Sequence, residues 1–146
     1  MALKTETRDI RGKKIRVTQL PFARARRTLV RLTNLLGPVF AELADAAPSL
    51  DQLGLGKRIG ELFAGLSDED LEFFADAFGA QSEIQTDKGG WVYLASPESR
   101  ANAFEGSLLA FFEWLRFAAE VNYADFLSVL ADQSAAGPAH QSAPAK

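Results

Sequence analysis

Residues 104–130 read FEGSLLAFFEWLRFAAEVNYADFLSVL, and this stretch decides the fold because it is more apolar than a surface helix of a small protein needs to be. At 100° per residue, its apolar side chains form two adjacent stripes. The first stripe, expected to face the core, consists of Phe104, Leu108, Phe111, Phe112, Leu115, Ala118 and Ala119. The second consists of Ala110, Trp114, Phe117 and Val121. Such a helix is either central to its own domain or partly covered by another protein.

Length and composition limit the classes of protein to consider. The chain has 146 residues, no cysteine and a single histidine, His140. This length predicts one domain, over residues 1–132, that buries about two-thirds of the surface exposed by the unfolded chain. The absence of cysteine excludes disulfides and thiol catalysis, and one histidine excludes histidine triads and multi-histidine metal sites. No apolar run approaches the ~18 residues of a membrane span. We therefore expect a soluble protein that is not an enzyme and has no cofactor.

Charge is unevenly distributed along the chain. Residues 1–34 contain ten basic and two acidic residues, a net charge of +8, whereas the remainder carries −11. Arg24, Arg27 and Arg31 line one face of a predicted helix. Such a stripe can pair within the protein, dock an acidic partner or contact nucleic acid. Because the acidic remainder would repel a duplex and no nucleic-acid-binding motif is present, we do not expect nucleic acid to be the partner.

The first half of the chain predicts a strand followed by helices. Apolar and polar residues alternate over residues 14–19, which is typical of a half-buried strand. Pro21 then opens a leucine-rich helix, because proline is tolerated in a first helical turn. We expect Gly37-Pro38 to kink or briefly break this helix. A second, short helix is predicted over residues 55–66.

The second half predicts a further helix and a hairpin. Ser67 can cap a helix that Gly79 ends. Beyond it, Asp-Lys-Gly-Gly at residues 87–90 predicts a turn between two short strands. We expect these strands to pack on the helices, with the strand at 14–19 as a third member. Residues 133–146 show no periodicity and are expected to be disordered. The predicted fold is α+β and predominantly helical: an N-terminal strand and a hairpin packed on four to five helices, the last of them long and aromatic.

Four short motifs, in order, resemble the bacteriophage tail assembly chaperone family of long-tailed phages and related prophages. They are VTQLPFARA at residues 17–25, LLGP at 35–38, FEG at 104–106 and EVNYADF at 120–126. Each motif alone is weak, but their order and separation are harder to obtain by chance. The resemblance spans about residues 11 to 131.

The resemblance implies a non-enzymatic chaperone of the host bacterial cytoplasm that is absent from the finished virion. Members of this family keep the long, aggregation-prone tape measure protein soluble and help recruit tail tube protein around it. In many relatives, a programmed ribosomal frameshift appends a second domain. A frameshifted longer form of the chain itself is therefore a further expected partner, and no membrane is involved.

A tape measure protein is long, helical and apolar in places, so a chaperone that holds it needs an apolar surface that accepts helices. Trp and Tyr suit such a surface because each combines a large apolar body with a polar group. We expect the partner-binding residues to be Trp114, Phe117, Val121, Tyr123 and Phe126, with Arg24, Arg27 and Arg31 supplying charge complementarity. The alternative for the five apolar residues is the second side of a buried central helix.

Two other functions remain open on the sequence. One is a small regulatory prophage protein that binds nucleic acid through the arginine stripe. The other is a structural tail component, such as a completion protein, which would be present in purified particles.

Overall fold

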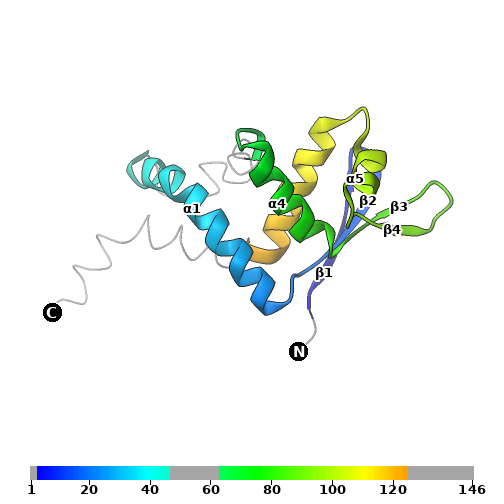
Figure 1. Cartoon of the computed structure of the whole chain (residues 1–146), viewed down its shortest axis with the longest axis horizontal. Helices are drawn as coiled ribbons and strands as arrows, with labels where there is room; N and C mark the ends of the chain where they lie inside the picture. The colour runs from blue at the N-terminus through cyan, green and yellow to red at the C-terminus, as the bar shows by residue number, and fades with distance from the viewer. Residues whose placement is uncertain (1–2, 47–62, 125–146) are drawn as a thin grey trace.

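A computed structural model describes residues 3–46 and 63–124, and for residues 36–46 it describes the backbone alone. The described helices are α1 (Phe22–Ala46), α4 (Asp68–Gly79), α5 (Pro97–Phe104) and a last helix, which begins at residue 108 and is described to residue 124. Figure 1 shows α1, α4 and the last helix gathered beside an antiparallel sheet. The prediction of a mostly helical α+β fold is confirmed.

The sheet contains one strand more than predicted. Its strands are β1 (Thr5–Ile10), β2 (Lys13–Thr18), β3 (Ser82–Gln85) and β4 (Trp91–Tyr93), hydrogen-bonded in that order and all antiparallel. The strand predicted at 14–19 is β2, and it pairs with β3 of the predicted hairpin as expected. The additional strand β1 returns from β2 through Arg11 and Gly12, with φ of 51° and 85°. Positive φ at both central residues is the geometry of a tight hairpin turn.

Helix α1 begins at Phe22, directly after Pro21, as predicted, and it is continuous to Ala46. Of the two outcomes expected at Gly37-Pro38, a kink or a brief break, the break is wrong. A proline ring clashes with the Cβ of the residue before it when that residue is helical, and Gly37 has no Cβ. The helix can therefore pass through the proline without ending.

Helix α4 has the predicted cap, but Gly79 serves a different purpose from the one expected. The Ser67 hydroxyl accepts a hydrogen bond from the Asp70 backbone N–H at 3.2 Å, as predicted for an N-cap. Gly79 is the last residue of the helix, yet it does not adopt the left-handed conformation of a glycine stop. Instead, a Cβ at position 79 would overlap the carbonyl group of Leu94. Glycine is needed because the chain after β4 passes directly over this turn.

The long helix predicted from Phe104 begins later, at residue 108, because Phe104 is the last residue of a separate helix, α5. α5 begins at Ser96 with a capping box, in which the side chains of Ser96 and Ser99 each accept from the other's backbone N–H, and it ends at Phe104. Gly106 then takes a φ of 81°, and the Ser107 hydroxyl accepts from the Ala110 N–H at 3.3 Å, capping the last helix. The turn brings the Phe104 ring back onto the Trp114 ring, with centroids 5.5 Å apart.

The last helix is the centre of the core. It contacts the sheet where the Arg8 guanidinium lies 4.3 Å from the Phe117 ring centre, and it contacts α4 where Tyr123 lies against Phe78. Ion pairs from the β1–β2 hairpin hold its outer edge: Arg8 to Glu120 at 3.1 Å and Arg11 to Glu113 at 2.7 Å. Its fully buried side chains are Ala110, Trp114, Leu115, Phe117, Ala118 and Ala119. Each large one contributes about 1.5–3 kcal/mol through burial.

Several predictions lie outside the described residues. They concern most of the short helix at 55–66, the side chain of Phe126 and the tail from 133 to 146. Phe63 is described, is buried, and meets the Phe74 ring edge-on with centroids 5.4 Å apart.

Candidate partner-binding surface

The structure places the aromatic residues that we expected on the surface inside the core. Trp114 and Phe117 are 0% and 1% exposed, and Val121 and Tyr123 are each 5% exposed. They form the second side of a buried central helix, which was the alternative for these residues. Phe126 lies outside the described residues. In this conformation a partner cannot reach the four described side chains.

The polar groups of Trp114 and Tyr123 are used within the fold. The Trp114 Nε1–H donates to the Ser82 hydroxyl at 3.1 Å, which ties the last helix to β3. The Tyr123 hydroxyl donates to the Ala25 carbonyl oxygen at 3.0 Å, which ties it to α1. Burial raises the pKa of the Tyr123 phenol well above its ordinary value of 10.0, so this hydroxyl stays a donor at any physiological pH.

The three arginines of the predicted stripe do not share one environment. Arg24 and Arg27 are exposed on the first turns of α1. Arg31 is half-buried, donates to the Asp70 carboxylate at 2.6 Å and lies 4.4 Å from the Phe73 ring centre. These hydrogen bonds are the main cause of a lowered pKa for the Asp70 carboxyl, with burial acting in the opposite direction. Arg31 therefore joins α1 to α4, and only Arg24 and Arg27 are presented to a partner.

An apolar trough lies at the N-terminal end of the last helix, between this end, α4 and α5. It has a volume of about 690 Å³. We call it the α4–α5 trough, and its apolar lining consists of Leu71, Ala75, Pro97, Ala101, Phe104, Leu108, Phe111 and Phe112. Leu108 is 68% exposed, whereas Phe111 and Phe112 are half-buried. The first stripe of the aromatic helix, expected to be core throughout, thus opens to solvent at its beginning.

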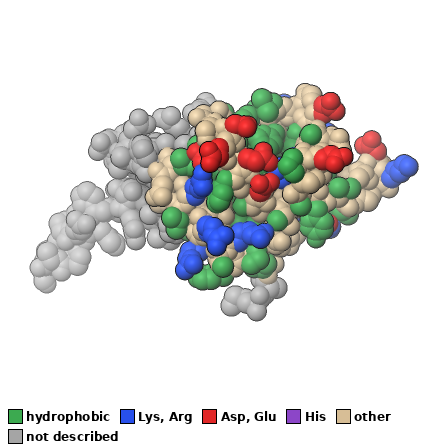
Figure 2. Space-filling view, viewed as in Figure 1, with side chains coloured by type: hydrophobic (Ala, Val, Ile, Leu, Met, Phe, Trp, Pro, Cys, Tyr) green, Lys and Arg blue, Asp and Glu red, His purple; other side chains and the backbone are tan. Residues whose placement is uncertain are grey.

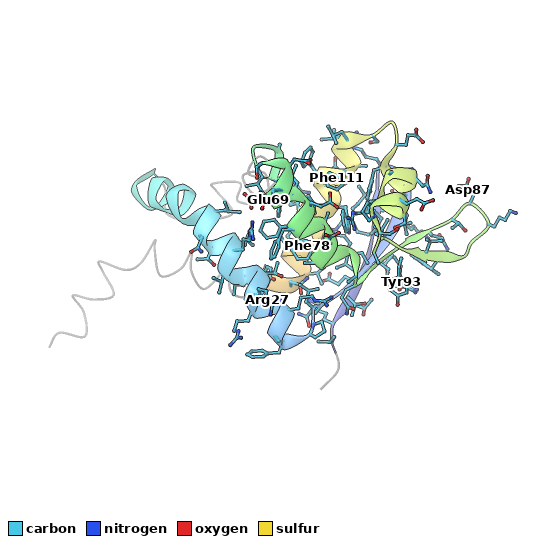
Figure 3. All side chains as sticks on the ribbon, in the orientation of Figure 1. Arg27, Glu69, Phe78, Asp87, Tyr93 and Phe111 are labelled. Atoms are coloured by element: carbon cyan, nitrogen blue, oxygen red, sulfur yellow. The ribbon has the colours of Figure 1, made fainter. Side chains whose placement is uncertain are left out.

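The aromatic rings of the trough are continuous with the core. Phe111 meets Phe104 and Phe112 edge-on, at centroid distances of 5.7 and 5.3 Å, and lies 5.9 Å from Trp114. These contacts pack the rings against their neighbours without enclosing them. Side chains that are already packed lose less rotational entropy when a partner docks. Figure 3 labels Phe111 on this part of the molecule, well away from Arg27 near the N-terminal end of α1.

Carboxylates border this trough. Asp68, Glu72 and Glu105 belong to its lining, together with one cation, Arg100. The Arg100 side chain is 6% exposed, and its Nη2 donates to both Glu72 and Asp76 at 2.6 Å. Its Nη1 donates to the carbonyl oxygens of Ala75 and Leu94. Arg100 is therefore a structural group that joins α4 to α5. Figure 2 shows acidic side chains around hydrophobic ones on this part of the surface, and basic side chains near the N-terminal end of α1.

The doublets Leu108-Leu109 and Phe111-Phe112 were a sequence signal for this trough. Neighbouring helical residues are 100° apart, so the four apolar side chains of the two doublets spread around a wide arc of the helix surface. An element that packs on one side of the helix does not cover all of them. Glu105-Gly106 immediately before them also marked a turn that leaves the helix start at the surface. Leu108, Phe111 and Phe112 were predicted to lie in the core stripe because the prediction starts a single helix at Phe104.

A second cavity, of about 700 Å³, is mainly polar. It lies between the two hairpin turns and α5, and its lining includes Arg11, Lys13 and Lys14 together with Asp9 and Asp87. Among the side chains that are described, those of residues 3–35 and 63–124, no group of three or more His, Asp or Glu could hold a metal ion. No helix within residues 3–46 and 63–124 is long and apolar enough to cross a membrane.

Comparison with known proteins identifies the family. No curated protein and no solved structure matches the chain. A family model described as phage tail assembly chaperone protein, TAC, matches residues 11–136. The match begins in the β1–β2 turn and takes in β2, the helices, the hairpin and the whole α4–α5 trough. Since it covers most of the 146 residues and agrees with the motifs found in the sequence, the chain belongs to the phage tail assembly chaperone family.

Proposed function

We propose that this protein is a non-enzymatic chaperone that binds the tape measure protein of its phage, keeps it soluble and helps recruit tail tube protein to it. It acts in the host bacterial cytoplasm and leaves before the virion is finished. Family membership supports the chaperone role in general. The observation that carries the specific proposal is the α4–α5 trough. It is an apolar surface that the described residues of the chain leave open to solvent.

The trough suits a helical client. Amphipathic helices dock by laying their apolar face into a hydrophobic groove, with anchors spaced three or four residues apart. The lining consists of aliphatic and aromatic side chains around Phe111 and Phe112, which offer contact area without demanding one particular sequence. Such tolerance is what a chaperone needs if it is to hold several segments of a long protein. A longer, frameshifted product of the same gene would present the same trough.

The N-terminal end of α1 is a second candidate surface for partner binding. Arg24 and Arg27 are exposed there, and Phe22 is 79% exposed with the Arg26 guanidinium 5.9 Å from its ring centre. This surface would attract an acidic partner, and the tail tube protein is the partner that we propose for it. A nucleic acid would bind through the same arginines. Variants of Arg24 and Arg27 can therefore distinguish binding of tail tube protein from binding of nucleic acid.

Co-expression tests the proposal directly. The tape measure gene from the same locus is expressed alone and together with this chain, and the soluble fraction of the tape measure protein is measured. We expect a clear increase in soluble tape measure protein and its co-purification with a tag on the chaperone. Unchanged solubility without co-purification would refute the proposed function. Mass spectrometry of purified virions is the companion test, because a structural tail component would be found there.

The arginine surface is tested by charge reversal. Arg24→Glu and Arg27→Glu together should weaken tail tube protein binding and leave the tape measure interaction intact. A titration with duplex DNA and RNA at low salt is the control. Binding to nucleic acid that is salt-sensitive in the wild type and lost in the double variant would favour the regulatory function instead.

A further inference from the structure

The charged residues that line the α4–α5 trough are mainly acidic. Among the described residues that line it, the acidic groups are Asp68, Glu72 and Glu105, and the single cation is Arg100. Arg100 is buried and already bonded to Glu72 and Asp76, so it offers no positive charge to a ligand. The Glu72 and Asp76 side chains are 51% and 58% exposed and keep a free side towards solvent.

Further carboxylates surround this lining. Glu69 and Glu98 are exposed on the first turns of α4 and α5, next in sequence to the lining residues Asp68 and Pro97. Figure 2 shows the result as acidic side chains distributed around a hydrophobic patch. Charges at the border of an apolar groove contribute mainly to choice of partner and to association rate, because like charges are repelled and opposite charges are steered in.

From this arrangement we propose, building on the proposed function, that the α4–α5 trough selects amphipathic helical segments of the tape measure protein whose apolar stripe is flanked by Lys and Arg. The apolar stripe packs on Leu108, Phe111 and Phe112. The flanking cations reach the carboxylates of Asp68, Glu72 and Glu105, and Lys and Arg can do so because their long stems lie along the apolar surface while the charge stays in water. Acidic amphipathic segments of equal hydrophobicity are rejected.

The chain offers matched pairs of variants for testing this. Leu108 and Leu109 are neighbours that are 68% and 53% exposed, but only Leu108 lines the trough. Leu108→Glu and Leu109→Glu therefore place the same charge on the same helix. Leu108→Glu places it inside the proposed site, and Leu109→Glu places it outside. Glu105→Lys reverses one border charge, and Asp87→Lys makes the same change at the tip of the β3–β4 hairpin, far from the trough in Figure 3.

The probe is a set of fluorescein-labelled peptides of about 25 residues, long enough for a helix of several turns, tiled across the tape measure protein of the same locus. Binding to the full chain is measured by fluorescence anisotropy. We expect the tightest peptides to be amphipathic and basic, and Leu108→Glu to weaken them about tenfold or more, since a buried leucine contact is lost. Leu109→Glu should stay within about twofold of the wild type. Circular dichroism checks that each variant is folded.

Charge is tested on both partners. Glu105→Lys should weaken the basic peptide about fivefold at low salt, and the loss should shrink as salt is raised. Asp87→Lys should change binding less than about twofold. Replacing the flanking Lys and Arg of the best peptide by Gln should reproduce the loss seen with Glu105→Lys. Equal binding of acidic and basic peptides, or no effect of Glu105→Lys, would overturn the charge selection.

Other results separate this inference from the proposed function. If full-length tape measure protein co-purifies with Leu108→Glu as well as with the wild type, the trough is not the site, although the chaperone function stands. If the wild type binds neither peptides nor the full-length protein, both fail. If Leu108→Glu instead abolishes a concentration-dependent increase in mass measured by light scattering, and peptides do not compete, a second copy of the chain occupies the trough and the inference is wrong.

Discussion

The two sides of the last helix have similar composition and different surroundings. Trp114 and Phe117 on one side are buried and contact Ser82 of β3 and Arg8 of β1, whereas Leu108 and Phe112 on the other side border an open trough. Both sides are aromatic, so composition alone does not separate them. The difference is in the neighbours: among the described residues, the buried side contacts β1, β3 and α1, whereas the open side borders α4 and α5.

Polar groups show the same division. Trp114 and Tyr123 looked suited to a surface because each has a hydrogen-bonding group, yet both donate that bond inside the protein, to Ser82 and to the Ala25 carbonyl. The open side uses Leu and Phe, which have no such group to satisfy and can be covered by a partner at no desolvation cost. On the last helix, Trp114 and Tyr123 thus join neighbouring elements through their polar groups, whereas Phe111 and Phe112 border the α4–α5 trough.

Truncating each side in turn should give the largest contrast. We expect Trp114→Ala to lower the free energy of unfolding by about 3–5 kcal/mol, because it removes a fully buried ring and leaves a cavity. Leu108→Ala should change it by less than about 0.5 kcal/mol. Urea unfolding followed by circular dichroism measures both. Trp114→Phe is a milder variant in case the alanine variant does not fold. Similar losses at positions 114 and 108 would mean that the two sides are not distinct.

Arg100 lies between the two sides, and its removal should cost less than removal of Trp114. Arg100→Met retains most of the side chain's bulk but leaves the carbonyl oxygens of Ala75 and Leu94 without their donor. We expect a loss of about 2–3 kcal/mol in urea unfolding. Glu72 and Asp76 are half-exposed and remain solvated, so they add little. Arg100→Lys should recover only part of the loss, because an ammonium lacks the planar fork. Full recovery would show that charge alone matters there.

The fold was predictable where one local pattern determined an element. Alternation revealed β2, Asp-Lys-Gly-Gly revealed the β3–β4 hairpin, and Ser67 revealed the start of α4. β1 was missed because it is an edge strand with only Ile10 buried, so its sequence has no apolar alternation to detect. Its position depends on pairing with β2, which is a tertiary contact.

The site was less predictable than the fold. Periodicity places residues on a helix face but does not say which face the rest of the chain will cover. The first stripe is buried at Leu115, Ala118 and Ala119 and is open only at its start, where Leu108, Phe111 and Phe112 border the trough between α4 and α5. This start follows the turn at Gly106, which has a φ of 81° and separates the last helix from α5. The arginine stripe is similar: Arg31 belongs to the same helix face as Arg27, but Asp70 and Phe73 of α4 occupy it.

A smaller effect tests the internal use of the Tyr123 hydroxyl. Tyr123→Phe keeps the ring and removes the hydrogen bond to the Ala25 carbonyl oxygen. We expect the free energy of unfolding to fall by about 1 kcal/mol, the net contribution of one such bond. The affinity for tape measure protein should not change, since the residue is 5% exposed. A loss of affinity with unchanged stability would return Tyr123 to the binding surface and would weaken the distinction drawn above.

The smallest effect concerns the contact between α1 and α4 at Arg31 and Asp70. Hydrogen bonds from Arg31 lower the pKa of the Asp70 carboxyl below 3.8, so the carboxylate stabilises the folded state at neutral pH. This contribution is complete above about pH 5 and is lost as the pH falls through 3.8 towards the lower folded-state pKa. Asp70→Asn should therefore be less stable than the wild type at pH 7, with the gap narrowing at lower pH in thermal unfolding. Arg31→Gln should remove most of the pH dependence that Asp70 supplies. A gap that does not narrow in acid would mean that Arg31 stabilises this contact by stacking on Phe73 rather than by its charge.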